Sequence, residues 1–295
     1  MLKVTKLIKY YDGITALNKV SLNVEKGDIY GFLGPNGAGK TTTIRIIMGI
    51  IKQDSGSIKL DNFEINDKSR MTLGYLPEDR GLYQKQNLED VLVYFASLRG
   101  FNFIDSKKKS TYWLDRFDLS NRKTRKIEEL SKGNQQKVQF IISLIHDPTI
   151  LILDEPFTGL DPLNQLLIKD IIKEMQSDGK TILFSTHQMG QVERICNRIC
   201  LMNKGSVILE GDLNNIKSSY GSNAIELTFE GELINKKLKH FFSEFSIKQN
   251  TLKGILKTDS DSFLKWVINR VLVTSFHIIV PDLEKIFIQE VKSKY

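Results

Sequence analysis

Cysteine is scarce in this sequence of 295 residues, which contains two. Cys196 and Cys200 are four positions apart and share one face of residues 193–200 if that segment is helical. Two thiolates alone make a poor metal site. We therefore expect both to be small apolar side chains buried in a protein of a reducing compartment.

Long apolar runs are also missing. No stretch approaches the ~20 apolar residues that a helix needs to cross a bilayer. The first six residues lack the apolar core of a secretory signal peptide. We therefore expect a cytoplasmic protein whose link to a membrane depends on a partner.

No basic or acidic tail is present either. Lys and Arg number 42 against 35 Asp and Glu, and the net charge of +7 is spread over the parts before and after residue 212. A diffuse excess of this kind does not predict a nucleic-acid surface. A diffuse positive charge suits a protein that functions near the anionic inner leaflet of a membrane, or it contributes only to solubility.

A phosphate-binding loop is the most informative feature that is present. Gly34, Gly37 and Gly39 let the backbone curve so that its N–H groups point at phosphate oxygens. Lys40 can reach the β- and γ-phosphates, and the hydroxyl of Thr41 can bind Mg²⁺. The residues expected to bind the triphosphate of a nucleotide are Gly34, Pro35, Asn36, Gly37, Ala38, Gly39, Lys40, Thr41 and Thr42.

The surroundings of the loop have the order that such a site needs. Residues 28–33 are predicted to form a buried strand that enters the loop, and residues 43–48 a helix that leaves it. Residues 86–99 and 111–117 show helical spacing, and the polar residues 105–110 between them are predicted to be an exposed link.

An alternation of strands and helices follows. A helix is expected over residues 135–146 and a buried parallel strand over 149–153, and the pattern continues to about residue 202. This alternation predicts an α/β sheet covered on both faces. From about residue 213 the pattern changes to short strands and helices, which indicates a second, small domain.

Two acidic residues end the buried strand over 149–153. Asp154 is placed to hold a Mg²⁺ ion beside the phosphate loop. Neighbouring residues at a strand end point in different directions, so Glu155 can face the γ-phosphate and polarise an attacking water molecule.

The order of these motifs resembles that of the ATP-binding-cassette (ABC) ATPases, the nucleotide-binding subunits of ABC transporters. Tyr11 corresponds to the aromatic residue that stacks on adenine in that family. Residues 130–136, Leu-Ser-Lys-Gly-Asn-Gln-Gln, resemble the family signature, and residues 159–161, which end in Asp161, resemble the loop after the acidic strand. His187 matches the switch histidine that contacts the γ-phosphate.

The resemblance implies a P-loop NTPase cassette with an antiparallel β subdomain and a helical subdomain. In that family two cassettes face each other head to tail, as a homodimer or a heterodimer. Each ATP is held by one phosphate loop and by the signature of the facing cassette, for which Ser131, Gly133 and Asn134 are the candidates here. The resemblance makes Glu155, His187 and Lys40 the catalytic residues of a Mg²⁺-dependent ATPase, with Asp161 also at the nucleotide.

Two positions depart from the family pattern. Glu78 stands where many members have glutamine, and it adds a negative charge beside the triphosphate while it can still ligate Mg²⁺. We expect a stronger Mg²⁺ dependence than glutamine would give. Lys132 replaces a signature glycine, and it either adds a cation near the partner's phosphate or is simply solvated.

Residues 73–83, the variant signature and residues 281–287 resemble the bacterial ABC-2-type exporter ATPases. The expected organisation is a nucleotide-binding domain over residues 1–212, with its helical subdomain at about 84–146, and a small α+β accessory domain over 213–295. The implied function is ATP hydrolysis coupled to a separate integral-membrane permease, with the chain peripheral on the inner face of the membrane. The alternative is a cassette that signals or regulates without transport.

Overall fold

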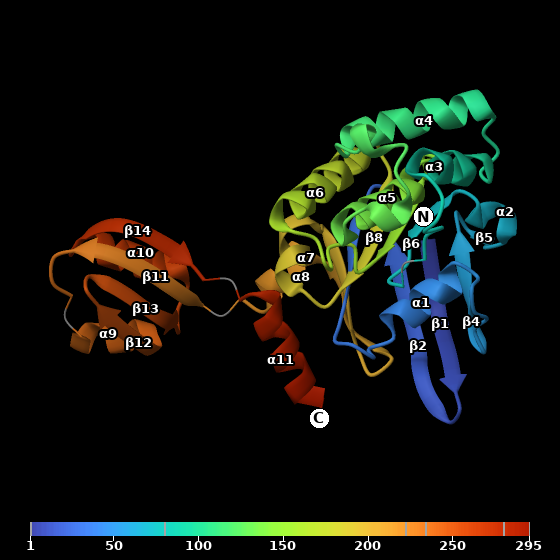
Figure 1. Ribbon diagram of the computed structural model, residues 1–295. Coiled ribbons are helices and arrows are strands. Elements are labelled where there is room, and N and C mark those ends of the chain that lie inside the picture. The colour runs from blue at the N-terminus through green and yellow to red at the C-terminus, as the bar shows by residue number, and fades with distance from the viewer. Residues whose placement is uncertain (1, 80, 222, 234, 280, 295) are drawn as a thin grey trace. The chain divides into compact units, whose positions relative to one another are not determined.

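The computed structural model describes residues 2–79, 81–221, 223–233, 235–279 and 281–294. The chain folds into two compact units, an N-terminal unit (Met1–Asp212) and a C-terminal unit (Leu213–Tyr295) (Figure 1). Among the helices of the described ranges, none is both long enough and apolar enough to cross a bilayer.

The N-terminal unit contains an antiparallel sheet with the strand order β2-β1-β4-β5. Its strands are β1 (Leu2–Tyr11), β2 (Ile14–Val24), β4 (Ser55–Leu60) and β5 (Phe63–Glu64). Apolar residues alternate along β1 and β2, so that one face of the sheet is buried. Leu2 pairs with Val24 and Val4 with Leu22, and all four side chains lie in the core.

A second sheet of six strands has the order β10-β9-β3-β8-β7-β6, in which β10 alone is antiparallel to its neighbour. Its strands are β3 (Ile29–Leu33), β6 (Leu73–Leu76), β7 (Ile150–Asp154), β8 (Thr181–Thr186), β9 (Arg198–Asn203) and β10 (Ser206–Asp212). Every residue of β3, β7 and β8 is buried, as the continuous apolar runs predict.

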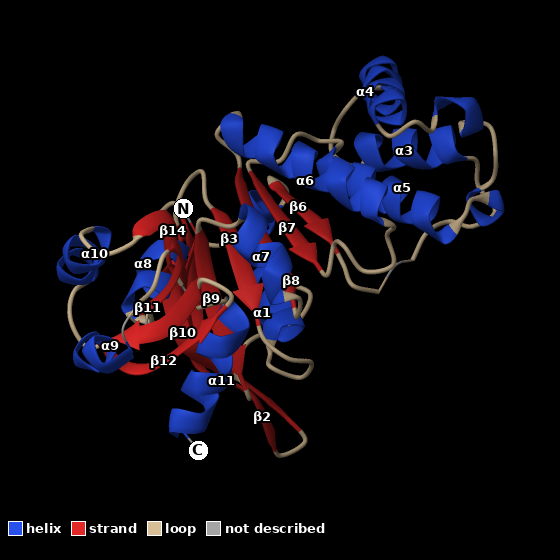
Figure 2. Ribbon diagram, turned by 90° about the vertical axis from the view of Figure 1, so that its left-hand side faces the viewer, coloured by secondary structure: helices blue, strands red, loops and turns tan. Residues whose placement is uncertain are grey.

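Helices cover this sheet (Figure 2). Helix α1 packs against β7, α5 against β6, α6 against β8 and α7 against β3. Their bounds are α1 (Lys40–Ile47), α5 (Lys132–Leu144), α6 (Pro162–Ser177) and α7 (Met189–Ile195), with the short α2 (Asp67–Arg70) after the antiparallel sheet. The predicted α/β class is confirmed.

A group of helices lies between β6 and β7 in the sequence. It consists of α3 (Leu88–Ser97), α4 (Phe103–Arg116), the 3-10 turns η1 (Ser120–Arg122) and η2 (Ile127–Glu129), and α5. The prediction of an exposed link over residues 105–110 was wrong, because these residues lie inside α4. Asn102 caps the helix by accepting a hydrogen bond from the backbone of Asp105, and the small side chains of Ser106 and Ser110 allow close packing on the buried side.

The two cysteines do not share a helix face. Helix α7 ends at Ile195, and Cys200 lies in β9. The helix stops because Asn197 binds the start of β3, with its side chain accepting from the Ile29 N–H at 2.7 Å and donating to Asp28 at 2.8 Å. Burial raises the pKa of both thiols.

The C-terminal unit has a βαββαβ core with the sheet order β12-β13-β11-β14, all antiparallel. This order is that of the ferredoxin-like fold. The elements are α8 (Leu213–Ser219), β11 (Ala224–Glu230), α9 (Asn235–Phe241), β12 (Phe242–Lys248), β13 (Thr251–Leu256), α10 (Ser260–Ile268), β14 (Leu272–Ile278) and α11 (Leu283–Lys294). Phe242, Phe263 and Leu227 lie at its core.

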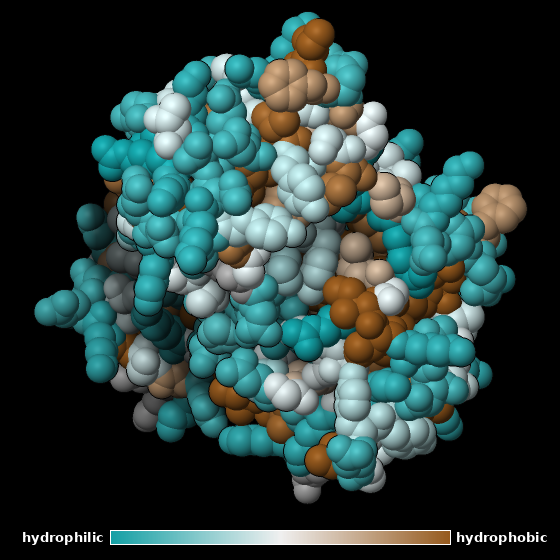
Figure 3. Space-filling view, turned by 45° about the vertical axis from the view of Figure 1, so that its right-hand side comes forward, coloured by the Kyte–Doolittle hydropathy of each residue, from teal (hydrophilic) through white to brown (hydrophobic). Residues whose placement is uncertain are grey.

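The surface of the chain is largely hydrophilic in the view of Figure 3, with hydrophobic patches at its top and to the right of its centre. Large apolar side chains that are well exposed include Phe63 and Leu163, each at 78%, and Phe103 at 68%. Single exposed apolar residues are normal, so only their grouping is informative.

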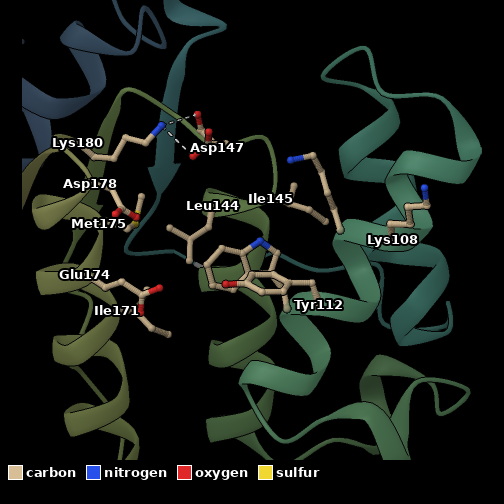
Figure 4. Close-up of a pocket in the computed structure, with 12 residues that line it drawn as sticks. Lys108, Tyr112, Leu144, Ile145, Asp147, Ile171, Glu174, Met175, Asp178 and Lys180 are labelled. Carbon is tan, nitrogen blue, oxygen red and sulfur yellow. Dashed lines mark hydrogen bonds and ion pairs between the residues drawn. The ribbon is translucent and has the colours of Figure 1, made fainter.

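A cavity of about 390 Å³ lies between α4, α5 and α6 (Figure 4). Beside it, Arg116 of α4 makes a two-pronged ion pair with Glu174 of α6, at 2.7 and 2.6 Å. The hydrogen bonds from Arg116 lower the pKa of Glu174. This pair connects the group of helices to a helix of the six-stranded sheet.

We expect Glu174→Gln to lower the free energy of unfolding by about 0.5–1 kcal/mol at neutral pH, a small value because the Glu174 side chain is half exposed. Since its pKa is lowered in the folded state, the stabilisation is present above the ordinary carboxylate pKa and is lost as pH falls through the lowered value. Urea unfolding of parent and variant across this range measures the difference. Glu128→Gln, in a pair at 4.0 Å, is the control. A difference that persists in acid would contradict the assignment.

Candidate nucleotide site

The glycine-rich loop connects the end of β3 to the start of α1. Gly34 and Gly39 have φ angles of 153° and 102°, which disfavour other residues. A Cβ on Gly34 would lie 2.4 Å from the carbonyl oxygen of Met202. The loop therefore lies directly on the turn between β9 and β10, and the Gly205 N–H donates to the Ala38 carbonyl at 3.0 Å.

Lys40 begins α1 and is 6% exposed. Its ammonium group donates to the carbonyl oxygens of Gly34 at 2.8 Å and Pro35 at 3.2 Å. Burial lowers the pKa of Lys40, and the nearby carboxylates of Glu155, Asp154 and Glu78 act in the opposite direction. The positive charge of Lys40 thus lies at the glycine-rich loop, with three carboxylates nearby.

Asp154 ends β7 and is fully buried. The hydroxyl of Ser185 donates to its Oδ1, whereas Oδ2 has no hydrogen-bond partner among the described residues. Burial raises the pKa of Asp154, against the hydroxyls of Ser185 and Thr41, which lower it. The hydroxyl of Thr41 donates its hydrogen bond to Glu78, at 3.4 Å. A buried carboxylate oxygen without a partner, next to a hydroxyl and a second carboxylate, fits a divalent cation that also binds phosphate oxygens.

Glu155 has a φ of 49°, which turns its side chain away from that of Asp154. Its Oε1 accepts a hydrogen bond from the His187 backbone N–H at 3.1 Å and lies 2.9 Å from Nδ1 of the His187 ring. Its Oε2 accepts from the hydroxyls of Thr186 at 3.3 Å and Thr158 at 3.4 Å. Both oxygens of the carboxylate are therefore held, by groups at the end of β8 and by Thr158 in the segment after β7.

These residues surround a cavity of about 710 Å³. Its lining includes Tyr11, Glu78 and Glu155, together with the loop residues Asn36, Gly37, Ala38, Gly39, Lys40, Thr41 and Thr42. Asp154 and His187 do not line the cavity themselves. They lie close to it, because Asp154 interacts with Thr41 and His187 contacts Glu155, and both of those residues line it. The cavity therefore combines a basic, glycine-rich floor with an acidic side.

Sequence reasoning missed two parts of this cavity. Lys204 lines it from the turn between β9 and β10, and residues 14–16 of β2 line it beside Tyr11. The available signal was the pair Lys204-Gly205, a turn in which a Cβ on Gly205 would lie 2.6 Å from the Ala16 carbonyl oxygen. Nothing in the sequence pattern placed this turn next to the loop.

The remaining predicted residues lie elsewhere. Ser131 caps α5 by accepting from the Asn134 N–H at 3.3 Å, and Asp161 caps α6 by accepting from the Asn164 N–H at 3.0 Å. Gly133 faces the Asn164 side chain. The structure thus gathers these signature residues around the starts of two helices, and none of them is among the residues that line the 710 Å³ cavity.

Comparison with known proteins identifies this arrangement. A family model described as "ABC transporter" matches residues 17–158. The chain is 35% identical to the ABC transporter ATP-binding protein YhaQ of Bacillus subtilis, over all of both chains. It is 32% identical to the daunorubicin/doxorubicin resistance ATP-binding protein DrrA of Streptomyces peucetius, over 75% of this chain and 68% of that protein.

A solved structure shares the fold. The dimeric ATP-binding cassette MJ0796, in a post-hydrolysis state bound to ADP and Pi, matches with a TM-score of 0.66 and 26% identity, over 72% of this chain and 99% of that one.

We expect Gly34→Ala to destabilise the N-terminal unit by about 1–3 kcal/mol, because the added methyl group has to displace the Met202 carbonyl or the loop. Gly13→Ala is the matched control, since Gly13 also has a positive φ, of 83°, but has open space around its Cβ position. Chemical unfolding compares the two variants. Equal losses would show that backbone strain alone, and not the close approach, governs Gly34.

Proposed function

This chain belongs to the ABC transporter family as an ATP-binding and ATP-hydrolysing subunit of the exporter type, and we propose that it works as half of a head-to-tail cassette dimer that drives a separate membrane permease. The observation that carries the proposal is the separation of the predicted residues. The loop, Glu78 and Glu155 surround one cavity, whereas Ser131, Gly133 and Asn134 do not line it. A second cassette that presents its own signature would complete the site.

In this proposal the loop holds the triphosphate of ATP. The backbone N–H groups of residues 36–42, which include the start of α1, bind the phosphates. Lys40 exchanges its bonds to the Gly34 and Pro35 carbonyls for bonds to phosphate oxygens. Tyr11, which is 43% exposed at the edge of the cavity, is the residue for stacking on adenine.

Mg²⁺ would be held by Thr41, Glu78 and Asp154, with Ser185 orienting the carboxylate of Asp154. When bound, the ion neutralises charge on the phosphates. Glu78 contributes a full negative charge at this position, so the site needs the cation more than it would with glutamine there.

Glu155 is the proposed general base. Its carboxylate is 7% exposed and lines the cavity beside the phosphate loop. It takes the proton of the attacking water molecule while His187, Thr158 and Thr186 keep it in place. His187 is half exposed and so is also available to a γ-phosphate.

The partner cassette supplies the other side. Ser131, Gly133 and Asn134 lie at the start of α5, where the N–H groups of the first turn and the helix dipole can bind the γ-phosphate of the facing site. Asp161, at the start of α6, lies beside this signature. Loss of the γ-phosphate removes the anion that both cassettes bind, so hydrolysis lets them separate.

Export through a permease is supported by the relatives, one of which is named for resistance to daunorubicin and doxorubicin. We propose residues 1–212 as the nucleotide-binding domain, with its helical subdomain at about 84–146, and residues 213–295 as an accessory domain. The chain would then be cytoplasmic and peripheral on the inner face of the membrane, with no nucleic-acid partner. A regulatory cassette without transport is the alternative, and it would not copurify with an integral-membrane permease.

We expect Glu155→Gln to reduce ATP turnover by at least about 100-fold and to accumulate an ATP-bound dimer, because the amide keeps the shape of the side chain but cannot take a proton. Turnover and size-exclusion chromatography with ATP measure both effects. Lys40→Ala is the comparison variant, because it should lose nucleotide binding and therefore stay monomeric with ATP. Turnover of Glu155→Gln at the parent rate would disprove its role as the base.

We expect Glu78→Gln to need less Mg²⁺ for half-maximal ATP hydrolysis, because one negative charge beside the triphosphate is removed. A Mg²⁺ titration at fixed ATP gives this value. Asp79→Asn is the control, because Asp79 is the adjacent acid, is 93% exposed and pairs with Arg45 at 3.4 Å. An unchanged titration for Glu78→Gln would remove Glu78 from the cation site.

A further inference from the structure

The outward face of α4 groups apolar and basic side chains at one end of the helix. Phe103 and Ile104 form its first turn and are 68% and 66% exposed. Lys107 and Lys108 follow one turn later and are also exposed. Because residues four apart lie on the same side of a helix, each lysine stands next to one of the two apolar side chains.

The opposite face of α4 fixes this orientation. Ser106, Ser110 and Leu114 are buried, so the helix cannot rotate to hide Phe103 and Ile104 without exposing them. The aromatic and aliphatic pair is therefore held outward by the packing of the helix.

The other charges near this end are already engaged. The carboxylate of Asp105 accepts a hydrogen bond from the Asn102 side chain at 2.8 Å. The ammonium of Lys109 lies 4.6 Å from the centre of the Phe101 ring. Lys108 extends from α4 away from Leu144 and Glu174 (Figure 4). At this end of α4, the exposed surface therefore consists of the apolar side chains of Phe103 and Ile104 with the positive charges of Lys107 and Lys108 beside them.

Helix α4 is the outermost of the helices between β6 and β7 in both ribbon views (Figures 1 and 2). Its first turn presents Phe103 and Ile104 with 68% and 66% of their surface exposed, so it suits insertion into a soft surface better than reception of a partner's side chain. Apolar side chains that enter the boundary of the acyl chains, flanked by lysines that meet anionic headgroups, are the chemistry of a membrane-surface contact.

We propose that residues 103, 104, 107 and 108 form a lipid contact with which the chain binds an anionic bilayer directly. This goes beyond the proposed function, because the contact needs no permease. It orients the group of helices between β6 and β7 toward the membrane and adds to whatever affinity a permease provides. The acyl boundary receives Phe103 and Ile104, and the lysines bind lipid phosphates.

The test is sedimentation of the full-length chain with sucrose-loaded vesicles of phosphatidylcholine, with and without 30% phosphatidylglycerol. The parent should bind the anionic vesicles and lose this binding at high salt. The double variant Lys107→Gln/Lys108→Gln should bind about 25-fold more weakly, at about fivefold for each lysine. The double variant Phe103→Ser/Ile104→Ser should also lose most of its binding, and at low salt as well.

Matched controls separate the contact from general charge and hydrophobicity. Phe63→Ser removes a side chain that is 78% exposed on β5. Lys3→Gln/Lys59→Gln removes two exposed positive charges from residues that lie opposite each other on the neighbouring strands β1 and β4. Both controls should bind as the parent does. Equal binding to neutral vesicles, or equal losses in the controls and the α4 variants, would overturn the proposal.

ATP turnover without vesicles serves as the check on folding, and it should be unchanged in the α4 variants. It also separates this proposal from the previous one. If the parent hydrolyses ATP but does not bind vesicles, the lipid contact alone is refuted. If the parent binds vesicles but its Glu155→Gln variant keeps full ATP turnover, the proposed catalytic site alone is refuted.

Discussion

The structure depends on one constraint, the side-by-side pairing of the buried parallel strands β3, β7 and β8. Leu33 pairs with Thr186, and Asp154 with Ser185. Parallel strands leave their sheet at the same edge, so the glycine-rich loop, the two acids and His187 meet although they lie far apart in the sequence. A shift of one residue between β7 and β8 would separate the Ser185 hydroxyl from Asp154.

The same edge concentrates opposite charges in a small volume. Lys40 lies among three carboxylates, and one oxygen of Asp154 has no partner among the residues that the structure describes. Groups of this kind cost stability unless a ligand completes them. The buried apolar strands around them supply the rigidity that keeps the arrangement in place.

Strong local patterns made much of the fold predictable. Continuous apolar runs identified β3 and β7, and glycine, which adopts backbone conformations that other residues disfavour, identified the loop. The error at residues 105–110 arose because a polar run on an exposed helix has the composition of a loop. The side chains that pack inward there are serines, which are small and polar, so the buried face gives no apolar pattern. The spacing of Cys196 and Cys200 left open whether residues 193–200 are helical, because Asn197 ends α7 through bonds to β3, which no local pattern reveals.

The parts of the site that lie within one short motif were predictable. The parts that depend on contacts between residues far apart in the sequence were less so. The loop and the acids Asp154 and Glu155 could be identified from short motifs. The Ser185 hydroxyl on Asp154 and the position of Lys204 follow from pairings between distant strands, and such pairings have no signature in a single sequence. The functional roles of the site residues stay predictions.

In the proposed site, the bonds from Lys40 to the Gly34 and Pro35 carbonyls would make the loop selective among anions. An anion that enters has to compete with two carbonyl oxygens for the ammonium and has to tolerate three nearby carboxylates. A singly charged anion such as chloride gains too little from the lysine to displace them, whereas a polyphosphate makes several charge-assisted bonds at once. The proposed loop would therefore discriminate among anions by their charge density, before the base or the ribose of a nucleotide is bound.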